Sequence, residues 1–166
     1  LDAEADVEKA IAITVNSKTH RTGVCNAMET LLVDEAIATA LLPQVAEALR
    51  EKGVQLRVDE CGANILGEGV TAATTEDWDT EFLDLICAIR VVRGVGGAIA
   101  HINTHGSGHT ESIVTENEST ARRFQQEVDS STIFWNASTR FSDGGEFGMG
   151  AEIGISTDKI GARGPM

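Results

Sequence analysis

The sequence has few basic residues, few aromatic side chains and no long hydrophobic run. Its 166 residues include 13 Lys and Arg against 26 Asp and Glu, which gives a formal net charge of −13. Nucleic-acid binding needs basic residues clustered on one face, so this charge argues against a nucleic-acid partner but still permits a small anionic substrate. No apolar block approaches the roughly 20 residues of a membrane-crossing helix. We therefore expect a protein that binds neither nucleic acid nor a membrane.

Cysteine is also scarce. The three cysteines, Cys25, Cys61 and Cys87, form an odd set without CxxC or any other metal-ligand spacing. Such a set is typical of a reducing compartment rather than of a disulfide framework. The first residue is Leu1, and the opening residues lack the basic-then-apolar layout of a secretory signal. We expect a cytoplasmic location and a sequence that is a piece of a longer chain.

Helix-like and strand-like segments alternate along the chain. Apolar residues at helical spacing predict helices over 7–18, 42–52, 96–106 and 118–129. Runs rich in β-branched residues predict strands over 30–34, 54–60, 85–92, 111–115 and 131–137. This alternation predicts an α/β fold with a mostly parallel sheet covered by helices, and functional loops at the carboxyl ends of the strands.

The pattern divides the chain into two parts. Residues 1–136 are expected to form one α/β domain, with a connection over 20–29 that holds Cys25. Residues 137–166 are glycine-rich and weakly periodic, and they contain few core-forming blocks. We expect this second segment to close over a site.

Cys25 is a candidate nucleophile. Lys18, His20 and Arg21 precede it, and nearby cations stabilise the reactive thiolate form of a cysteine. A free cysteine is more often a small buried side chain, however, and local sequence leaves both readings open. Cys87 lies inside an apolar strand and is interpreted as core, while Cys61, beside Gly62 on a predicted loop, is compatible with either reading.

Histidine recurs every four residues at His101, His105 and His109, which on one helix face would suggest a metal site. Gly106 and Gly108 are expected to end the helix before His109, and no further ligand has the spacing to complete a metal site. The alternative is a polar loop that holds an oxyanion.

Arg140 follows the last predicted strand. A guanidinium can bind a carboxylate or phosphate through two parallel hydrogen bonds, although an ordinary surface arginine is equally compatible with this position. The acidic residues between 76 and 81 are, from local sequence, mostly solvated charge.

The segment RTGVCNAMETLLV (21–33) resembles the nucleophile segment of gamma-glutamyl phosphate reductases, members of the aldehyde dehydrogenase superfamily. The resemblance continues through 78–86, 98–117, 128–166 and the opening DAEAD, so it covers nearly the whole chain. It implies an aldehyde dehydrogenase catalytic-domain-like fold. It also implies an NADPH-dependent enzyme of proline biosynthesis that converts L-glutamyl 5-phosphate to L-glutamate 5-semialdehyde and phosphate through a cysteine thioester.

The resemblance also implies roles for individual residues. Cys25 matches the residue that attacks the acyl phosphate, and Glu81 matches the superfamily glutamate that contacts the nicotinamide ribose. His105, Ser107, Ser138 and Arg140 lie in matching loops and are expected to contact the phosphate or the glutamyl group. No metal is implied.

The chain departs from the family pattern in two respects. Residues 93–97 form a less acidic entry to the following helix than is usual. The nucleotide-binding domain and the terminal oligomerisation strand have no counterpart in this sequence. We therefore expect that the isolated chain neither binds NADPH tightly nor turns over, whereas the parent enzyme is homo-oligomeric. The alternatives are the reductase half of a bifunctional pyrroline-5-carboxylate synthase and a non-catalytic assembly module of the same fold.

Overall fold

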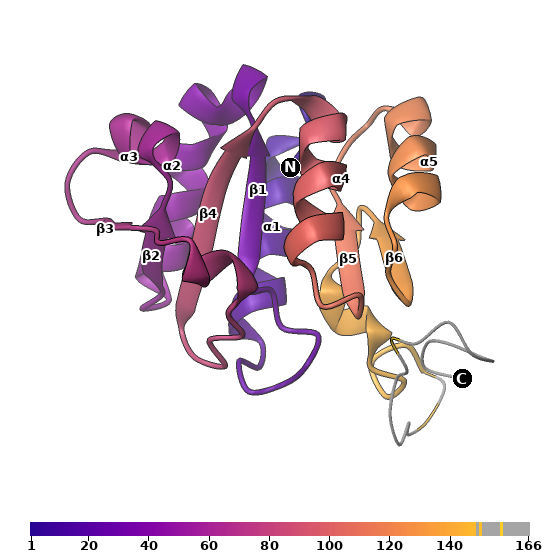
Figure 1. Ribbon diagram of the computed structural model, residues 1–166. Helices are drawn as coiled ribbons and strands as arrows, with labels where there is room; N and C mark the ends of the chain where they lie inside the picture. The colour runs from indigo at the N-terminus through magenta and orange to yellow at the C-terminus, as the bar shows by residue number, and fades with distance from the viewer. Residues whose placement is uncertain (149, 151–156, 158–166) are drawn as a thin grey trace.

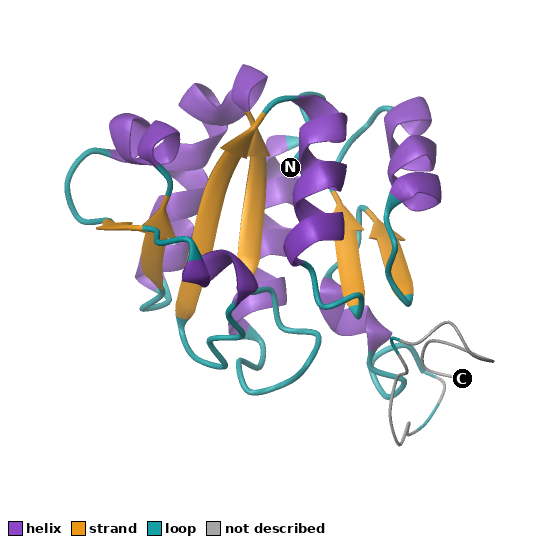
Figure 2. Cartoon of the chain, viewed as in Figure 1, coloured by secondary structure: helices purple, strands orange, loops and turns teal. Residues whose placement is uncertain are grey.

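The computed structural model describes residues 1–148, 150 and 157 and contains two parallel sheets. The larger sheet has the strand order β1-β4-β2-β3, formed by β1 (Thr30–Asp34), β4 (Ile86–Val92), β2 (Gln55–Val58) and β3 (Thr71–Ala72). The smaller sheet pairs β5 (Thr110–Ile113) with β6 (Thr132–Trp135). Pairing is parallel within each sheet, and apart from the short β3 the strands of the two sheets point the same way (Figure 2). The predicted α/β class with a mostly parallel sheet is confirmed.

Helices cover both faces of these sheets (Figure 1). α1 (Val7–Thr19) and α2 (Glu35–Glu51) lie behind the larger sheet, and α4 (Gly94–His105) lies in front of the space between β1 and β5. α5 (Glu118–Glu127) lies beside β6. The main core packs α2 against the larger sheet through fully or almost fully buried side chains, including Leu42, Val45, Leu49, Val33, Leu56 and Ile89. None of the helices in the described part of the chain is long and apolar enough to cross a membrane.

Short polar side chains start four of the helices. Each accepts a hydrogen bond from a backbone N–H two or three residues further on: Asp6 from Lys9, Asp34 from Ala36, Asp59 from Gly62 and Asn117 from Thr120, at 2.9 to 3.1 Å. Such caps satisfy donors that have no partner within the helix, and each contributes about 1 kcal/mol.

Two helices differ from the sequence prediction. α2 begins at Glu35 rather than at residue 42, because Asp34 caps it directly after β1, and Pro43 therefore lies inside the helix. α3 (Glu60–Leu66) occupies a stretch for which a loop was predicted, and Asp59 caps its first turn. Cys61 consequently lies on a helix. In both places a capping aspartate directly after a strand decides the start of the helix.

Gly62 lies on α3 where the helix meets β2. A Cβ atom at this position would lie 2.4 Å from Val58 Cγ1 and 3.0 Å from Asp59 Oδ1. We expect Gly62→Ala to lower the free energy of unfolding by about 1–3 kcal/mol, because overpacking forces neighbouring atoms to shift. Urea denaturation measures this change. Gly23→Ala is the matched control, since a Cβ at Gly23 has nothing within 4 Å; an equal loss in both variants would contradict the steric explanation.

Residues 1 and 2 connect the two sheets. The Leu1 amino group donates to the Leu32 carbonyl at 2.7 Å, and the Leu1 carbonyl accepts from Asp34 N at 2.9 Å. Asp2 N donates to the Val114 carbonyl at 3.1 Å. The carboxyl ends of β1 and β5 are therefore joined through this short segment, and the two strands border a cavity along their length.

The glycine-rich segment predicted over 137–166 is described only in part. A short 3-10 helix, η2 (Thr139–Ser142), follows β6 and packs against α1 and β5. The rest of the segment beyond residue 148, apart from residues 150 and 157, lies outside the described residues. The division of the chain at residue 136 stays a prediction.

Candidate active site

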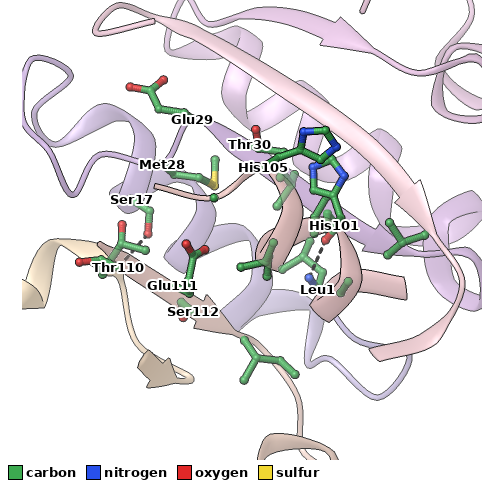
Figure 3. Close-up of a pocket in the computed structure, with 18 of the residues that line it drawn as sticks. Leu1, Ser17, Met28, Glu29, Thr30, His101, His105, Thr110, Glu111 and Ser112 are labelled. Carbon is green, nitrogen blue, oxygen red and sulfur yellow. Dashed lines mark hydrogen bonds between the residues drawn. The ribbon is translucent and has the colours of Figure 1, made fainter. Parts of the chain in front are cut away.

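A cavity of about 370 Å³ lies between β1 and β5 and extends to the loops at their amino ends. The two strands and α4 form much of its wall and contribute both apolar side chains and polar ones, among them Glu111, His101 and His105 (Figure 3). Four of the predicted site residues line it: Cys25, Glu81, His105 and Ser107. The fold thus brings together residues from three separate segments of the chain.

These segments lie at the amino ends of the strands, which corrects the expectation that functional loops gather at the carboxyl ends. The Cys25 loop leads into β1, residues 80–85 lead into β4, and residues 106–109 lead into β5. In a parallel sheet all three connections reach the same edge. The carboxyl-end rule holds where strand-to-helix loops carry the ligand site, whereas the predicted residues Cys25, Glu81 and Ser107 lie on helix-to-strand connections.

Of the three cysteines, Cys25 alone lines the cavity. It is exposed on an irregular loop whose only turn bond joins Ala27 N to Val24 O at 3.0 Å. Cys61 is exposed on α3, away from the cavity wall. Cys87 is fully buried in β4, and burial raises the pKa of its thiol to about 12. A buried thiol of this kind is inert, so Cys25 is the one thiol with access to the cavity.

An ion pair fixes the end of the Cys25 loop. Lys18 is fully buried at the end of α1, and its Nζ lies 2.7 Å from Glu29 Oε2. Glu29 Oε1 accepts a hydrogen bond from Leu83 N at 3.3 Å. Leu83 has a positive φ of 53°, which is unfavourable for a non-glycine residue. Glu29 thereby ties the Cys25 loop to the loop that carries Glu81.

His105 and Glu81 bring polar groups to the opposite wall. His105 is the last residue of α4, and its Nδ1 lies 2.8 Å from Asp79 Oδ1. Glu81 and Ser107 are exposed at the cavity mouth. An exposed carboxylate such as Glu81 can accept hydrogen bonds from ribose hydroxyl groups, which fits the predicted contact with a nicotinamide nucleotide.

His101 lies deeper in the cavity wall, with 8% of its surface exposed. Its Nδ1 lies 2.9 Å from Arg90 Nη1, and its ring centroid lies 4.6 Å from that of His105. Because a guanidinium can only donate, Nδ1 of His101 accepts and its proton resides on Nε2. Burial, followed by the charges of Arg90 and His105, lowers the pKa of His101 to about 4. The ring is therefore neutral at physiological pH.

The three regularly spaced histidines do not converge. His109 bonds through Nδ1 to Thr110 Oγ1 at 2.7 Å, on the strand side of the loop, while His101 and His105 face each other on α4. In the part of the chain that is described, no three His, Cys, Asp or Glu side chains are arranged to hold a metal ion.

Glu111 is a cavity residue that the sequence analysis did not select. It lies on the same face of β5 as the buried Ile113, which packs with Ile99 of α4, so the Glu111 side chain turns towards α4. Its Oε1 accepts a hydrogen bond from Ser130 Oγ at 3.4 Å. Burial raises the pKa of the Glu111 carboxyl to about 7. The sequence could have indicated this residue, because the alternation of side chains along a strand places a carboxyl at position 111 on the inward face.

This raised pKa predicts a pH-dependent cost to folding. The folded state retains a proton on Glu111 that the unfolded chain loses above its ordinary pKa of 4.5, so stability falls as pH rises from there through about 7. His101 acts in the opposite direction, because its lowered pKa makes stability rise with pH up to its ordinary value of 6.5. A substitution of Glu111 alone leaves the contribution of His101 unchanged, so comparing that variant with the unmodified chain isolates the effect of Glu111.

We compare the free energy of unfolding of Glu111→Gln with that of the unmodified chain at two pH values. The difference in favour of the variant should be larger at a pH of about 8 than at about 5, by up to roughly 3 kcal/mol. Urea denaturation at both pH values gives this double difference. Glu8→Gln on the exposed face of α1 is the matched control for the same substitution at a surface position. Equal effects of Glu111→Gln at the two pH values would show that Glu111 titrates normally.

The structure does not bring Ser138 and Arg140 to the cavity wall. Both are 4% exposed, and neither lines the cavity. Ser138 Oγ lies 3.0 Å from Ser17 Oγ, and the Arg140 guanidinium contacts Asn26, His20 and Asp143. After β6 the chain runs back along α1 to the Cys25 loop, so these two side chains bond within the protein. Their predicted contact with substrate has no support in this geometry.

Comparison with known proteins gives a consistent result over the whole chain. The sequence matches no protein-family model. It is 56% identical over 174 aligned residues to the gamma-glutamyl phosphate reductase of Psychrobacter arcticus, an alignment that covers 100% of this chain and 40% of that protein. The chain therefore spans about two fifths of the length of the curated relatives it matches.

Solved structures agree. The crystal structure of gamma-glutamyl phosphate reductase from Thermotoga maritima superposes with a TM-score of 0.95 at 52% identity, covering 99% of this chain and 39% of that one. An acetylating aldehyde dehydrogenase from Geobacillus thermoglucosidasius superposes with a TM-score of 0.66 at 22% identity, covering 95% of this chain and 44% of that one. The second match supports the fold alone, which is that of aldehyde dehydrogenase-like proteins.

Proposed function

The chain belongs to the gamma-glutamyl phosphate reductase family, and from that premise we propose that it forms part of the catalytic domain of such an enzyme. The parent enzyme would reduce L-glutamyl 5-phosphate to L-glutamate 5-semialdehyde, with release of phosphate, in proline biosynthesis. The observation that carries this proposal is the position of Cys25, the one thiol on the wall of a cavity shared with the loops of Glu81, His105 and Ser107.

In the proposed first step, the Cys25 thiolate attacks the acyl carbon of the substrate. A bond forms between Sγ and the acyl carbon, and the bond from that carbon to the phosphate oxygen breaks. Phosphate leaves with the electron pair and a thioester remains. An acyl phosphate is already activated, so this step needs a thiolate and donors for the developing oxyanion rather than a base that activates water.

The second step consumes the thioester. NADPH, when bound, supplies the hydride for this reduction. Breaking the bond between the acyl carbon and Sγ then returns the thiolate of Cys25 and frees the semialdehyde. We assign Glu81 to the ribose of the nicotinamide nucleotide and His105 and Ser107 to oxygen atoms of the substrate. The apolar wall of the cavity would limit access of water, which would otherwise hydrolyse the thioester.

Phosphate dependence tests this function in the reverse direction. We propose that a full-length reductase carrying this sequence oxidises L-glutamate 5-semialdehyde with NADP only when inorganic phosphate is present. Phosphate takes the acyl group from the thioester in that direction. Replacing phosphate by coenzyme A, the acceptor of an acetylating enzyme, should give no NADPH. Undiminished oxidation without phosphate would point to a hydrolytic aldehyde dehydrogenase and overturn the proposal.

A further inference from the structure

Neighbouring residues of the Cys25 loop have opposite environments. Cys25 is exposed at the cavity, whereas Asn26 is 5% exposed. A loop without regular structure has no ladder of backbone bonds to hold it, so its conformation depends on such buried anchor residues. Asn26 is therefore the buried anchor next to Cys25 itself, in addition to the Glu29 ion pair at the end of the loop.

Among the described residues, the hydrogen bonds that anchor Asn26 come from η2. The Asn26 carbonyl accepts from Thr139 Oγ1 at 2.7 Å, and its side-chain Nδ2 donates to Ser142 Oγ at 2.9 Å. Its side-chain Oδ1 accepts from Arg140 Nη1. All three bonds join segments more than 110 residues apart in the sequence. The carbonyl, Nδ2 and Oδ1 of the buried Asn26 are therefore each hydrogen-bonded within the protein.

Arg140 joins the two sides of the same loop. Besides Asn26, its guanidinium donates through Nε to His20 Nδ1 at 3.3 Å and through Nη2 to Asp143 Oδ2 at 3.2 Å. His20 precedes Cys25 and Asn26 follows it, so one rigid planar group spans the start and the end of the exposed stretch. A guanidinium presents donors in a fixed fork, which a flexible ammonium group cannot reproduce.

η2 is itself attached to α1 and β5. Ser17 Oγ on α1 contacts Ser138 Oγ at 3.0 Å and accepts from Thr139 N at 3.3 Å. Ser142 Oγ receives a hydrogen bond from Thr110 Oγ1 on β5 at 3.1 Å. The short helix η2, which carries Arg140, is therefore connected to α1 and to β5, and both of these elements contribute residues to the cavity wall.

We infer that Arg140 is a positioning residue for Cys25: by bridging His20 and Asn26, its guanidinium holds the thiol at the cavity wall in the geometry that attack requires. This inference rests on the proposed nucleophilic role of Cys25. It reassigns Arg140 from contact with substrate to support of the nucleophile, because all three of its nitrogen atoms are engaged within the protein and its side chain is buried.

The test uses a full-length reductase carrying this sequence, with the variants Arg140→Met and Arg140→Lys. Misplacing a reacting group by about 1 Å can cost on the order of 100-fold, and we expect kcat to fall by about that factor in both variants. The KM for NADPH should stay within about twofold, since uniform binding of the cofactor is untouched. Added guanidinium ion should restore part of the activity of Arg140→Met and none of that of Arg140→Lys, whose ammonium group occupies the site.

Three controls separate positioning from other effects. Arg122→Met removes an exposed arginine of α5 and should leave kcat unchanged. Leu49→Ala weakens the core under α2 without touching the loop, so it shows whether loss of stability alone lowers kcat. Thr139→Val deletes only the hydrogen bond to the Asn26 carbonyl, and it carries the test if the Arg140 variants do not fold. We expect an intermediate loss of kcat in Thr139→Val.

The outcomes distinguish this inference from the proposed function. Unchanged kcat in the folded Arg140 variants, or in Thr139→Val where those do not fold, would overturn the positioning role. So would an increase confined to the KM for glutamyl phosphate, which would restore Arg140 as a substrate contact. If Cys25→Ser retained turnover in the same assay, the proposed function itself would fail. Loss of kcat with guanidinium rescue, together with an inactive Cys25→Ser enzyme, supports both.

Discussion

Replacing Cys25 by serine is expected to reduce the turnover of L-glutamyl 5-phosphate by at least about 1,000-fold in a full-length reductase carrying this sequence. A hydroxyl group ionises far less readily than a thiol, so serine is a much weaker nucleophile at this position. A steady-state assay of NADPH oxidation measures the loss. Both kcat and kcat/KM should fall to a similar extent. The bond to Sγ forms only in the transition state, so its loss leaves binding of the substrate unchanged.

Cys61→Ser is the matched control for this prediction. Cys61 is likewise exposed, but it lies on α3 outside the cavity, and we expect its variant to keep normal turnover. If Cys25→Ser and Cys61→Ser had similar activities, the thiol would not be the group that accepts the acyl chain.

Replacing Lys18 by methionine is expected to lower the free energy of unfolding by about 3 kcal/mol or more, because it leaves the charge of Glu29 without its partner in a largely buried position. Lys18 is fully buried, Glu29 is 16% exposed, and their charged atoms are 2.7 Å apart. The large effect comes from the unpaired charge rather than from the intrinsic strength of the pair. Urea denaturation of the chain measures it.

A double variant separates these two contributions. Lys18→Met combined with Glu29→Gln removes both charges, and we expect it to recover part of the stability that Lys18→Met loses. The single variant Glu29→Gln should also be destabilising, since it leaves Lys18 charged and fully buried. A Lys18→Met variant that unfolds at the same urea concentration as the unmodified chain would show that this pair is already solvated.

Much of the fold follows from local patterns in the sequence. Apart from the two-residue β3, for which no strand is predicted, the parallel strands and four of the helices coincide with apolar periodicity, because burial of one face selects the period of each element. Helix starts were harder to predict. α2 and α3 begin where they do because Asp34 and Asp59 supply caps directly after strands, whereas the proline and glycine signals nearby suggested a later start or a loop.

The site could be predicted only in part. The resemblance selected Cys25, Glu81, His105 and Ser107, and the structure brings these four to one cavity. It did not reveal that Arg140 reaches back to Asn26, because that contact joins residues 114 positions apart and depends on the path of the chain after β6. A contact of this kind cannot be predicted from composition or from the spacing of residues.

The most direct test of the account is a half-reaction without reductant. A full-length reductase carrying this sequence is mixed with L-glutamyl 5-phosphate in the absence of NADPH, and the protein is then digested and analysed by mass spectrometry. We predict release of phosphate in proportion to enzyme and a hydroxylamine-sensitive glutamyl thioester on the peptide that contains Cys25. Phosphate release without any adduct on Cys25, or an adduct on Cys61 instead, would contradict the account.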